Sequence, residues 1–271
     1  MSRDDRTARA SALASARHAA YARGEYVGQE SFMQAGEIRA LARRAGIGPG
    51  VSVLDLCCGV AGPGRLLTAE LGCRYLGVDR DPAAVDLARG AAGDLPCRFE
   101  VRSVPPLPDG TYDVVLLLET LLAFPDKDRL LEQVASALRV GGRFALTVEA
   151  GAPLTPAEQA DMPAADTVWP IPLPQLVAAL DRVGLAVDWA EDVSRAHRTT
   201  AAALADAFVA DRSTIGSRIG HRAVDELVEA HRLWCAWLDT GRVRKVALVA
   251  ARTGVRDPTG EPLAWSARSP S

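Results

Sequence analysis

The sequence predicts an α/β fold, a doubly wound and mostly parallel sheet of seven strands with a helical lid. Two observations predict it. Between residues 51 and 192, short apolar runs alternate with helical patterns, as in parallel strands joined by helices. From 194 to 241 the strand patterns stop and helical ones continue, before a last β-rich run at 244–250. The late helices are expected to cover the carboxyl ends of the strands, where ligands bind in such sheets.

The individual elements follow from these patterns. The two N-terminal helices are expected at 6–23 and about 30–45, with a Gly-containing interruption between them. The strands are expected at 51–56, 74–79, 98–102, 112–118, 143–149, 186–191 and 244–250. The later helices are expected at 63–71, 82–92, 126–139, 174–184, 201–210 and 221–238. Gly141 and Gly142 are interpreted as ending the helix before the fifth strand.

Five segments follow from this order. They are an N-terminal helical cap (1–45), a ligand-binding core (46–192), a helical insert or substrate lid (193–242), the last core strand (243–254) and a loosely held tail (255–271).

The stretch VSVLDLCCGVAGPGR, residues 51–65, predicts a nucleotide-binding turn. Its apolar start is typical of a buried parallel strand that stops at Asp55. Gly59, Gly62 and Gly64 let the backbone bend and approach a ligand, and Pro63 suits the first turn of a helix. The next strand ends at Asp79, where a doubly wound fold hydrogen-bonds ribose hydroxyls.

At these residues the chain resembles the class I methyltransferases that use S-adenosylmethionine, whose first motif reads roughly (V/I)-L-D-x-G-x-G-x-G. Asp55 matches the acid, Gly59 the central glycine and Ala61 the last one. The continuation GPGR, residues 62–65, is similar to small-molecule methyltransferases acting on sterols, tocopherols or methylated amines. The resemblance covers about residues 36–192 and the strand at 244–251, and it implies a Rossmann-like sheet. Cys57 departs from it, because the family has a glycine there.

The resemblance implies where S-adenosylmethionine binds. Asp55 and the Gly59 backbone would face the methionine amine and carboxylate, in a turn that includes Cys57 and Ala61. Asp79 would hold the ribose. The remaining contacts fall near the adenine (Arg80, Ser103 and Val104) and beneath the sulfonium (Leu118 and Glu119).

The N-terminal interruption adds two further candidates. In related methyltransferases this region folds over the cofactor, which makes Tyr26 and Gln29 candidate contacts. Packing within the N-terminal segment is the alternative for both residues.

Methyl transfer needs a positioned acceptor and, where the acceptor carries a proton, a base. Glu119 is a candidate polar group at the reacting centre; holding the cofactor's amine or capping a helix is the alternative. His197 and His221 are candidate bases in the insert, and their spacing predicts no metal site. Glu149 is interpreted as a solvated loop acid.

The insert also carries arginines among acids, as on a solvated helix surface. Their alternative role is to bind an anionic substrate, since planar guanidinium groups suit carboxylate or phosphate. The candidates are Arg195, Arg198, Arg218 and Arg222.

Composition restricts the function further. A net charge of −3 and the absence of a basic patch argue against nucleic acid as a partner. No apolar run is long enough for a membrane span and no signal peptide is evident, so a cytoplasmic enzyme is expected. Five scattered cysteines indicate reduced thiols.

The sequence therefore predicts a methyltransferase acting on O, N or C of a small molecule, with an anionic substrate as a further hypothesis. A same-fold protein that catalyses a cyclisation or rearrangement is the alternative. A nicotinamide oxidoreductase is disfavoured by the glycine spacing. The oligomeric state is not predicted.

Overall fold

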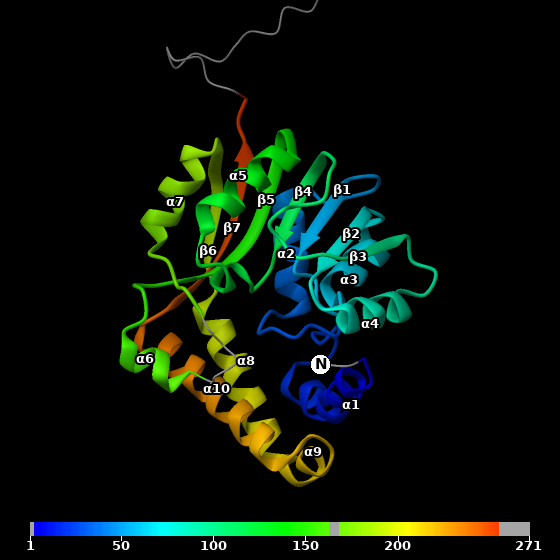
Figure 1. The fold of residues 1–271 in the computed structure, drawn as a ribbon, viewed down its shortest axis with the longest axis vertical. Helices are drawn as coiled ribbons and strands as arrows, with labels where there is room; N and C mark the ends of the chain where they lie inside the picture. The colour runs from blue at the N-terminus through cyan, green and yellow to red at the C-terminus, as the bar shows by residue number, and fades with distance from the viewer. Residues whose placement is uncertain (1–2, 163–167, 255–271) are drawn as a thin grey trace, which may run out of the picture.

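A computed structural model describes residues 3–162 and 168–254 (Figure 1). The core is a seven-stranded sheet in the order β3-β2-β1-β4-β5-β7-β6. Its strands are β1 (Ser52–Leu56), β2 (Arg74–Asp79), β3 (Cys97–Val101), β4 (Tyr112–Leu117), β5 (Leu138–Ala150), β6 (Leu185–Asp192) and β7 (Arg244–Arg252). Strands β1 to β5 pair in parallel, whereas β7 runs antiparallel between β5 and β6. The predicted fold class is confirmed.

Helices cover both faces of the sheet. One face packs against α2 (Ala35–Ala45), α3 (Gly62–Leu71) and α4 (Pro82–Ala92). The other packs against α5 (Lys127–Ala137) and α7 (Leu173–Arg182). Both cores consist mainly of aliphatic side chains from the strands and the inner stripe of each helix, so burial of apolar surface holds the layers together.

A helical lid lies beyond the carboxyl ends of the parallel strands (Figure 1). It combines α1 (Arg3–Ala20) with α8 (Ser194–Ala210), α9 (Arg212–Ile219) and α10 (His221–Thr240) around a small apolar core of its own. Leu13 of α1, Phe208 of α8 and Ile215 of α9 are among its most deeply buried side chains. The helical insert between β6 and β7 is thus present as expected, and α1 packs on it.

Three boundaries differ from the sequence-based expectations. Helix α2 begins at Ala35 instead of about 30 and packs on the sheet, although it was assigned to the cap. Helix α5 ends at Ala137, and Gly141 and Gly142 lie inside β5. There they form an irregularity opposite Tyr112 that needs Gly141 at a φ of 76° and leaves no room for a Cβ on Gly142.

One more boundary differs, because helix α8 starts at Ser194, seven positions before the expected residue 201. The remaining differences are additions, and the first is α9, which was not separately foreseen. Two short elements, η1 (Leu121–Ala123) and α6 (Pro156–Asp161), were also not predicted. The expected tail from 255 lies outside the described residues.

Candidate active site

The turn after β1 is unusually tight. Cys57, Gly59 and Ala61 all adopt left-handed backbone angles, with φ of 58°, 54° and 54°. Such angles are uncommon for residues with a Cβ, and they allow the Ala61 N–H to bond the Cys58 carbonyl at 2.8 Å. Ala61 is also the N-cap of α3 and supplies no side-chain cap. The first N–H groups of α3 therefore remain suited to an anionic group.

The N-terminal loop lies directly on this turn. A Cβ on Gly62 would come within 2.6 Å of the Gly28 carbonyl carbon and 2.7 Å of the Val27 oxygen. A Cβ on Gly28, whose φ is 90°, would lie 3.0 Å from Arg65 Nη2. Both glycines are thus needed for the backbones to approach each other closely.

Asp79 closes the turn from the neighbouring strand. Its Oδ2 accepts the Gly59 N–H at 2.9 Å, and its Oδ1 accepts the Asp81 N–H at 2.9 Å. Asp81 caps α4 through the Ala83 N–H and pairs with Arg6 of α1 at 2.7 Å. The two predicted residues Gly59 and Asp79 therefore meet, as expected for a site at a switch point of the sheet.

Asp55 lies beneath the turn, only 3% exposed, and accepts the Tyr75 hydroxyl at 2.6 Å. Burial raises the pKa of Asp55 to about 7; the Tyr75 hydrogen bond opposes this and the Asp79 charge adds to it. The Asp55 carboxyl group is thus engaged within the protein, by a hydrogen bond to Tyr75 of the neighbouring strand β2.

The paired cysteines are not activated thiols. Burial raises the pKa of Cys57 to about 12 and that of Cys58 further, with the charges of Asp55 and Asp79 adding to both. Since the thiolate is the nucleophile, both side chains serve as small packing groups around the turn.

The other predicted cofactor residues lie at the ends of β2, β3 and β4. Arg80 and Ser103 are exposed, whereas Val104 and Leu118 are half-buried and pack against the cores on the two faces. The Arg102 N–H bonds the Asp79 carbonyl at 2.8 Å, which brings the segment after β3 beside the end of β2.

Glu119 follows β4 with a left-handed φ of 62°. Its N–H donates to Thr147 Oγ1 at 2.8 Å, and the Thr147 hydroxyl donates to Glu119 Oε1 at 3.1 Å. The other oxygen accepts the Phe32 N–H at 3.4 Å. Glu119 is therefore positioned by β5 on one side and by the N-terminal loop on the other.

A buried lysine connects Glu119 to a second carboxylate. Lys245 of β7 is 2% exposed, lies 2.5 Å from Glu119 Oε1 and also contacts Glu149 Oε1. Burial disfavours the Lys245 ammonium, but the two carboxylates outweigh this effect and raise its pKa. Burial also raises the pKa of Glu149, whereas Lys245, His197 and Thr147 together overcome burial and lower that of Glu119.

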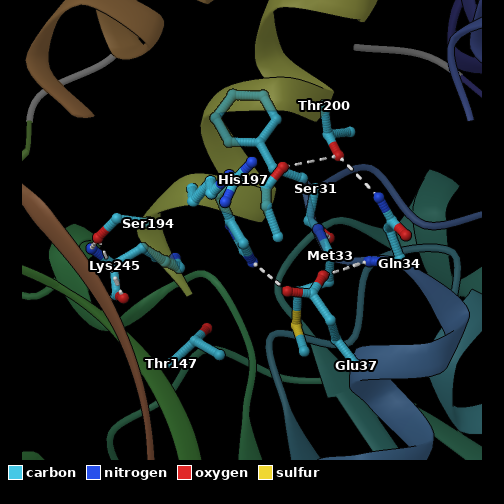
Figure 2. A network of polar contacts seen from close by, with 12 residues as sticks. Ser31, Met33, Gln34, Glu37, Thr147, Ser194, His197, Thr200 and Lys245 are labelled. Carbon is cyan, nitrogen blue, oxygen red and sulfur yellow. Dashed lines mark hydrogen bonds and ion pairs between the residues drawn. The ribbon is translucent and has the colours of Figure 1, made fainter. Parts of the chain in front are cut away.

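His197 of α8 extends this series of charges (Figure 2). It is fully buried, with Nε2 3.4 Å from Glu37 Oε1 of α2 and Nδ1 3.8 Å from Glu119 Oε1. Glu37, His197, Glu119, Lys245 and Glu149, in that order, form what we call the charge ladder. It joins the lid to α2 and to the sheet.

Only one of the two predicted histidines joins the ladder. His221 is exposed at the start of α10, beside α9 at the end of the lid remote from the sheet (Figure 1). The expectation that it acts near the reacting centre is therefore corrected, because the α9–α10 corner directs it away. His231 is mostly buried between Phe32 and Phe208, and its Nδ1 lies 2.7 Å from the Leu227 carbonyl.

The two N-terminal candidates differ from their expected roles. Gln29 is buried and uses its amide within its own loop, accepting the Val27 N–H and donating to the Glu25 and Met33 carbonyls. It shapes the loop and does not offer its amide to a ligand. Tyr26 is half-buried and its ring packs on those of His18 and Tyr21.

The insert arginines belong to surface ion pairs. Arg198 pairs with Asp239 at 3.5 Å, and Arg222, 92% exposed, pairs with Glu226 at 2.9 Å. Arg195 and Arg218 are exposed. These four arginines therefore lie on the solvated surface of the lid helices and do not meet in a buried site.

Sequence reasoning missed part of the ladder. Glu149 was interpreted as a solvated loop acid, but it is 7% exposed and paired with Lys245. Lys245, Glu37 and Thr147 were not singled out. One signal was available, because the chain has only two lysines, and Lys245 stands at the start of a strand that is otherwise apolar.

Among the described residues, 3–162 and 168–254, no group of three or more His, Cys, Asp or Glu side chains is placed to hold a metal ion. No helix in these ranges has the length and apolar character needed to cross a membrane.

Comparisons with known proteins agree with this geometry. Residues 54–146 match the family described as "Methyltransferase domain". The 27-O-demethylrifamycin SV methyltransferase of Amycolatopsis mediterranei is 30% identical over 199 residues, which cover 68% of this chain and 73% of that protein. A sterol 24-C-methyltransferase of Eremothecium gossypii is 31% identical over 112 residues, 39% of this chain. That match spans only 30% of the Eremothecium protein.

Solved structures show the same fold. The [4+2]-cyclase SpnF superposes with a TM-score of 0.67 at 21% identity, covering 90% of this chain and 92% of the cyclase. At this identity the likeness establishes the fold alone.

Proposed function

Because this chain belongs to the class I S-adenosylmethionine-dependent small-molecule methyltransferases, we propose that it transfers the methyl group of S-adenosylmethionine to a small molecule bound under the lid. The observation that carries the proposal is the meeting of Gly59 and Asp79 at the uncapped start of α3. The family uses this cofactor, and the sequence-based prediction of a methyltransferase is confirmed at that level.

The donor set of the site fits S-adenosylmethionine. The uncapped N-terminus of α3 suits the methionine carboxylate, and the Asp79 carboxylate retains lone pairs for the two ribose hydroxyls. The ladder holds three carboxylates, two against Lys245 and one against His197, and this excess of negative charge favours a nearby cation such as the sulfonium. When bound, the cofactor supplies an electrophilic methyl group.

We assign roles to the candidate residues on this basis. Gly59, Asp79 and the backbone of Cys57 and Ala61 hold the methionine and ribose parts, with Asp55 as the support of the turn. Arg80, Ser103, Val104 and Leu118 are proposed around the adenine and the sulfonium. Glu119 is proposed beside the reacting centre, where Lys245 and Thr147 fix its position.

His197 is the proposed base for an acceptor that carries a proton. It lies against Glu119, and Phe32 of the N-terminal loop packs edge-on over its ring at 6.4 Å. Since His197 is fully buried, the acceptor reaches it only when the loop around Phe32 moves aside. The lid would then exclude water from the reaction.

The acceptor atom remains a choice among oxygen, nitrogen and carbon. A cyclisation or rearrangement is the second candidate, and the likeness to a cyclase supports it at the level of fold only. Consumption of the methyl group separates the two functions. No nucleic-acid partner is proposed, given the net charge of −3.

Calorimetric titration with S-adenosylmethionine and with its demethylated product tests the proposal. We expect micromolar binding by the native chain and loss of binding in Asp79→Ala, because the ribose hydroxyls lose their acceptor and the Gly59 N–H its partner. Asp86→Ala is the matched control, since Asp86 lies on the outer side of α4 and pairs with Arg89. Absence of binding to the native chain, or equal binding by Asp79→Ala, would contradict the proposal.

A further inference from the structure

A small cavity lies behind His197, between α2, α8 and the sheet. Its volume is about 60 Å³, and its polar lining consists of Glu37, Thr147, Trp189, Glu191 and His197. Glu191 is exposed, whereas His197 is fully buried. The lining therefore reaches from the protein surface to the imidazole ring.

Three buried polar atoms at this cavity have no hydrogen bond. Both ring nitrogens of His197 and Oε1 of Glu37 are buried without a hydrogen bond. Buried polar groups in native proteins are almost always bonded, to protein or to ordered water. The cavity has room for roughly two water molecules at the volume each takes in the liquid, and its lining supplies the two to four polar partners that each water needs.

We propose that this cavity is a hydrated proton exit, which connects His197 to solvent through Glu37 and Glu191 on a route separate from the acceptor's entrance. The proposal rests on the proposed function, because it concerns the proton that an O–H or N–H acceptor gives up. Glu37 acts through His197 and is a positioning residue.

The step balances as follows. The acceptor atom forms a bond to the methyl carbon, the carbon–sulfur bond breaks, and its electron pair stays on the sulfur. The acceptor's O–H or N–H bond breaks, its electron pair remains on the acceptor, and the proton moves to a ring nitrogen of His197. From the ring the proton passes to cavity water and to bulk solvent, which leaves His197 neutral.

The charges on all sides of His197 favour this direction. Glu119 and Lys245 approach from the sheet, Glu149 stands behind Lys245, and Glu37 approaches from α2. Glu119 already accepts from Lys245 and Thr147, which leaves it a poor proton acceptor. Glu37 Oε1 has no such partner, and Glu191 stands at the exposed end.

Two variants test the exit: one fills the cavity and leaves the ladder in place, and the other removes the charge of Glu37. Ala40→Leu inserts three carbon atoms into the lining from α2, where Ala40 is half-buried. Ala91→Leu, on the exposed face of α4, is the matched control. Glu37→Gln removes the negative charge; its amide oxygen can still accept the Gln34 N–H, as Glu37 Oε2 does at 2.7 Å in the cap of α2, and its NH2 group then replaces the oxygen that lines the cavity. Glu132→Gln is the control for Glu37→Gln, because Glu132 is an exposed residue of α5.

The measurement is the solvent exchange rate of the His197 ring proton in the full-length chain labelled with ¹⁵N-histidine, without cofactor or acceptor. The signal is assigned by its loss in His197→Asn. We expect magnetisation transfer from water to the ring in the native chain, and exchange about tenfold slower in Ala40→Leu and Glu37→Gln than in their controls.

Equal exchange in folded Ala40→Leu and Ala91→Leu would overturn the exit, and so would a native ring that receives no magnetisation from water. If Ala40→Leu does not fold, Glu37→Gln decides by the same comparison with Glu132→Gln. S-adenosylmethionine titration of Ala40→Leu, which leaves every ladder residue in place, is expected to be unchanged. Failure of the proposed function therefore appears in the titration, and failure of the exit appears in the exchange rate.

Discussion

At the scale of single residues, Lys245 determines whether the charge ladder is tolerated. Three carboxylates approach one another in a region that water barely reaches, and among the described residues Lys245 is the cation that contacts two of them. Glu149 Oε2 has no hydrogen-bond partner, so the pair is imperfectly satisfied even in the native protein. Such a cluster costs stability and is retained for what it positions.

Removing the Lys245 ammonium group is expected to destabilise the folded protein strongly. Lys245→Met should lower the free energy of unfolding by about 3–5 kcal/mol, because it leaves Glu119 and Glu149 buried without a cation. Urea unfolding followed by circular dichroism measures the loss. Adding Glu149→Gln to Lys245→Met should recover part of the lost stability, because one of the two unpaired carboxylates is then removed. If Lys245→Met is as stable as the native chain, the prediction is wrong and water must solvate the ladder carboxylates.

Asp55 makes stability depend on pH. Its pKa in the folded chain, about 7, lies above its ordinary value of 3.8. The folded state therefore holds more protons than the unfolded state between these values, and the free energy of unfolding falls as the pH rises through that range.

Asp55→Asn should remove this dependence while keeping an oxygen for the Tyr75 hydroxyl. At pH 8 the variant should be more stable than the native chain by on the order of 4 kcal/mol, with little difference near pH 4. Melting temperatures over this range test the prediction, with Asp86→Asn as control. A parallel pH profile for Asp55→Asn and the native chain would contradict it.

At the scale of elements, the alternation of apolar and helical patterns was sufficient to predict the sheet. All seven strands were predicted within a few residues except β5, whose start at Leu138 was hidden by Gly141 and Gly142. Paired glycines are typical of both a helix end and a strand irregularity, and only pairing with Tyr112 distinguishes them.

The candidate site was predicted less completely. Gly59 was predicted from the glycine-containing turn after the first strand, and Asp79 from its place at the end of the next strand. The ladder was not, because its members come from β4, β5, β7, α2 and α8 and only the folded sheet brings them together. His221 has the same residue type as His197, and nothing in the sequence shows that the α9–α10 corner points away from the sheet.

The contact between α3 and the N-terminal loop depends on one glycine. Gly62→Ala places a Cβ against the backbone of Gly28 and Val27, so one element must shift. We expect a loss of about 1–3 kcal/mol and faster amide exchange across residues 24–33.

Gly90→Ala in α4 is the matched control for this substitution. A Cβ there has no neighbour within 4 Å, and the change should be neutral or stabilise by about 0.5–1 kcal/mol. Unaltered exchange of the loop in Gly62→Ala would show that the loop does not rest on the turn.

At the scale of the whole molecule, the lid and the sheet have separate apolar cores that meet over the proposed cofactor site. Binding of S-adenosylmethionine to the folded chain alone should stabilise it by about 2.7 kcal/mol at 100 times the dissociation constant. Thermal unfolding measures this gain, and amide exchange should slow in α1 and α8 as well as at the turn. The gain should be absent in Asp79→Ala; an equal gain there would place the ligand elsewhere.

The two strands that carry the lid are held together at their ends. Asp192 of β6 stands in register with Val246 of β7, the Val193 N–H bonds the Lys245 carbonyl, and Arg244 pairs with Asp192 at 2.7 Å. Residues 194–243 therefore leave the sheet and return to it at a single closed junction. A segment of different length and pocket shape can be grafted there without disturbing strand register, since loop length adds little to the cost of closure. On the proposed function, the segment that would bind the acceptor can therefore be exchanged while the strands that would bind the methyl donor stay unchanged.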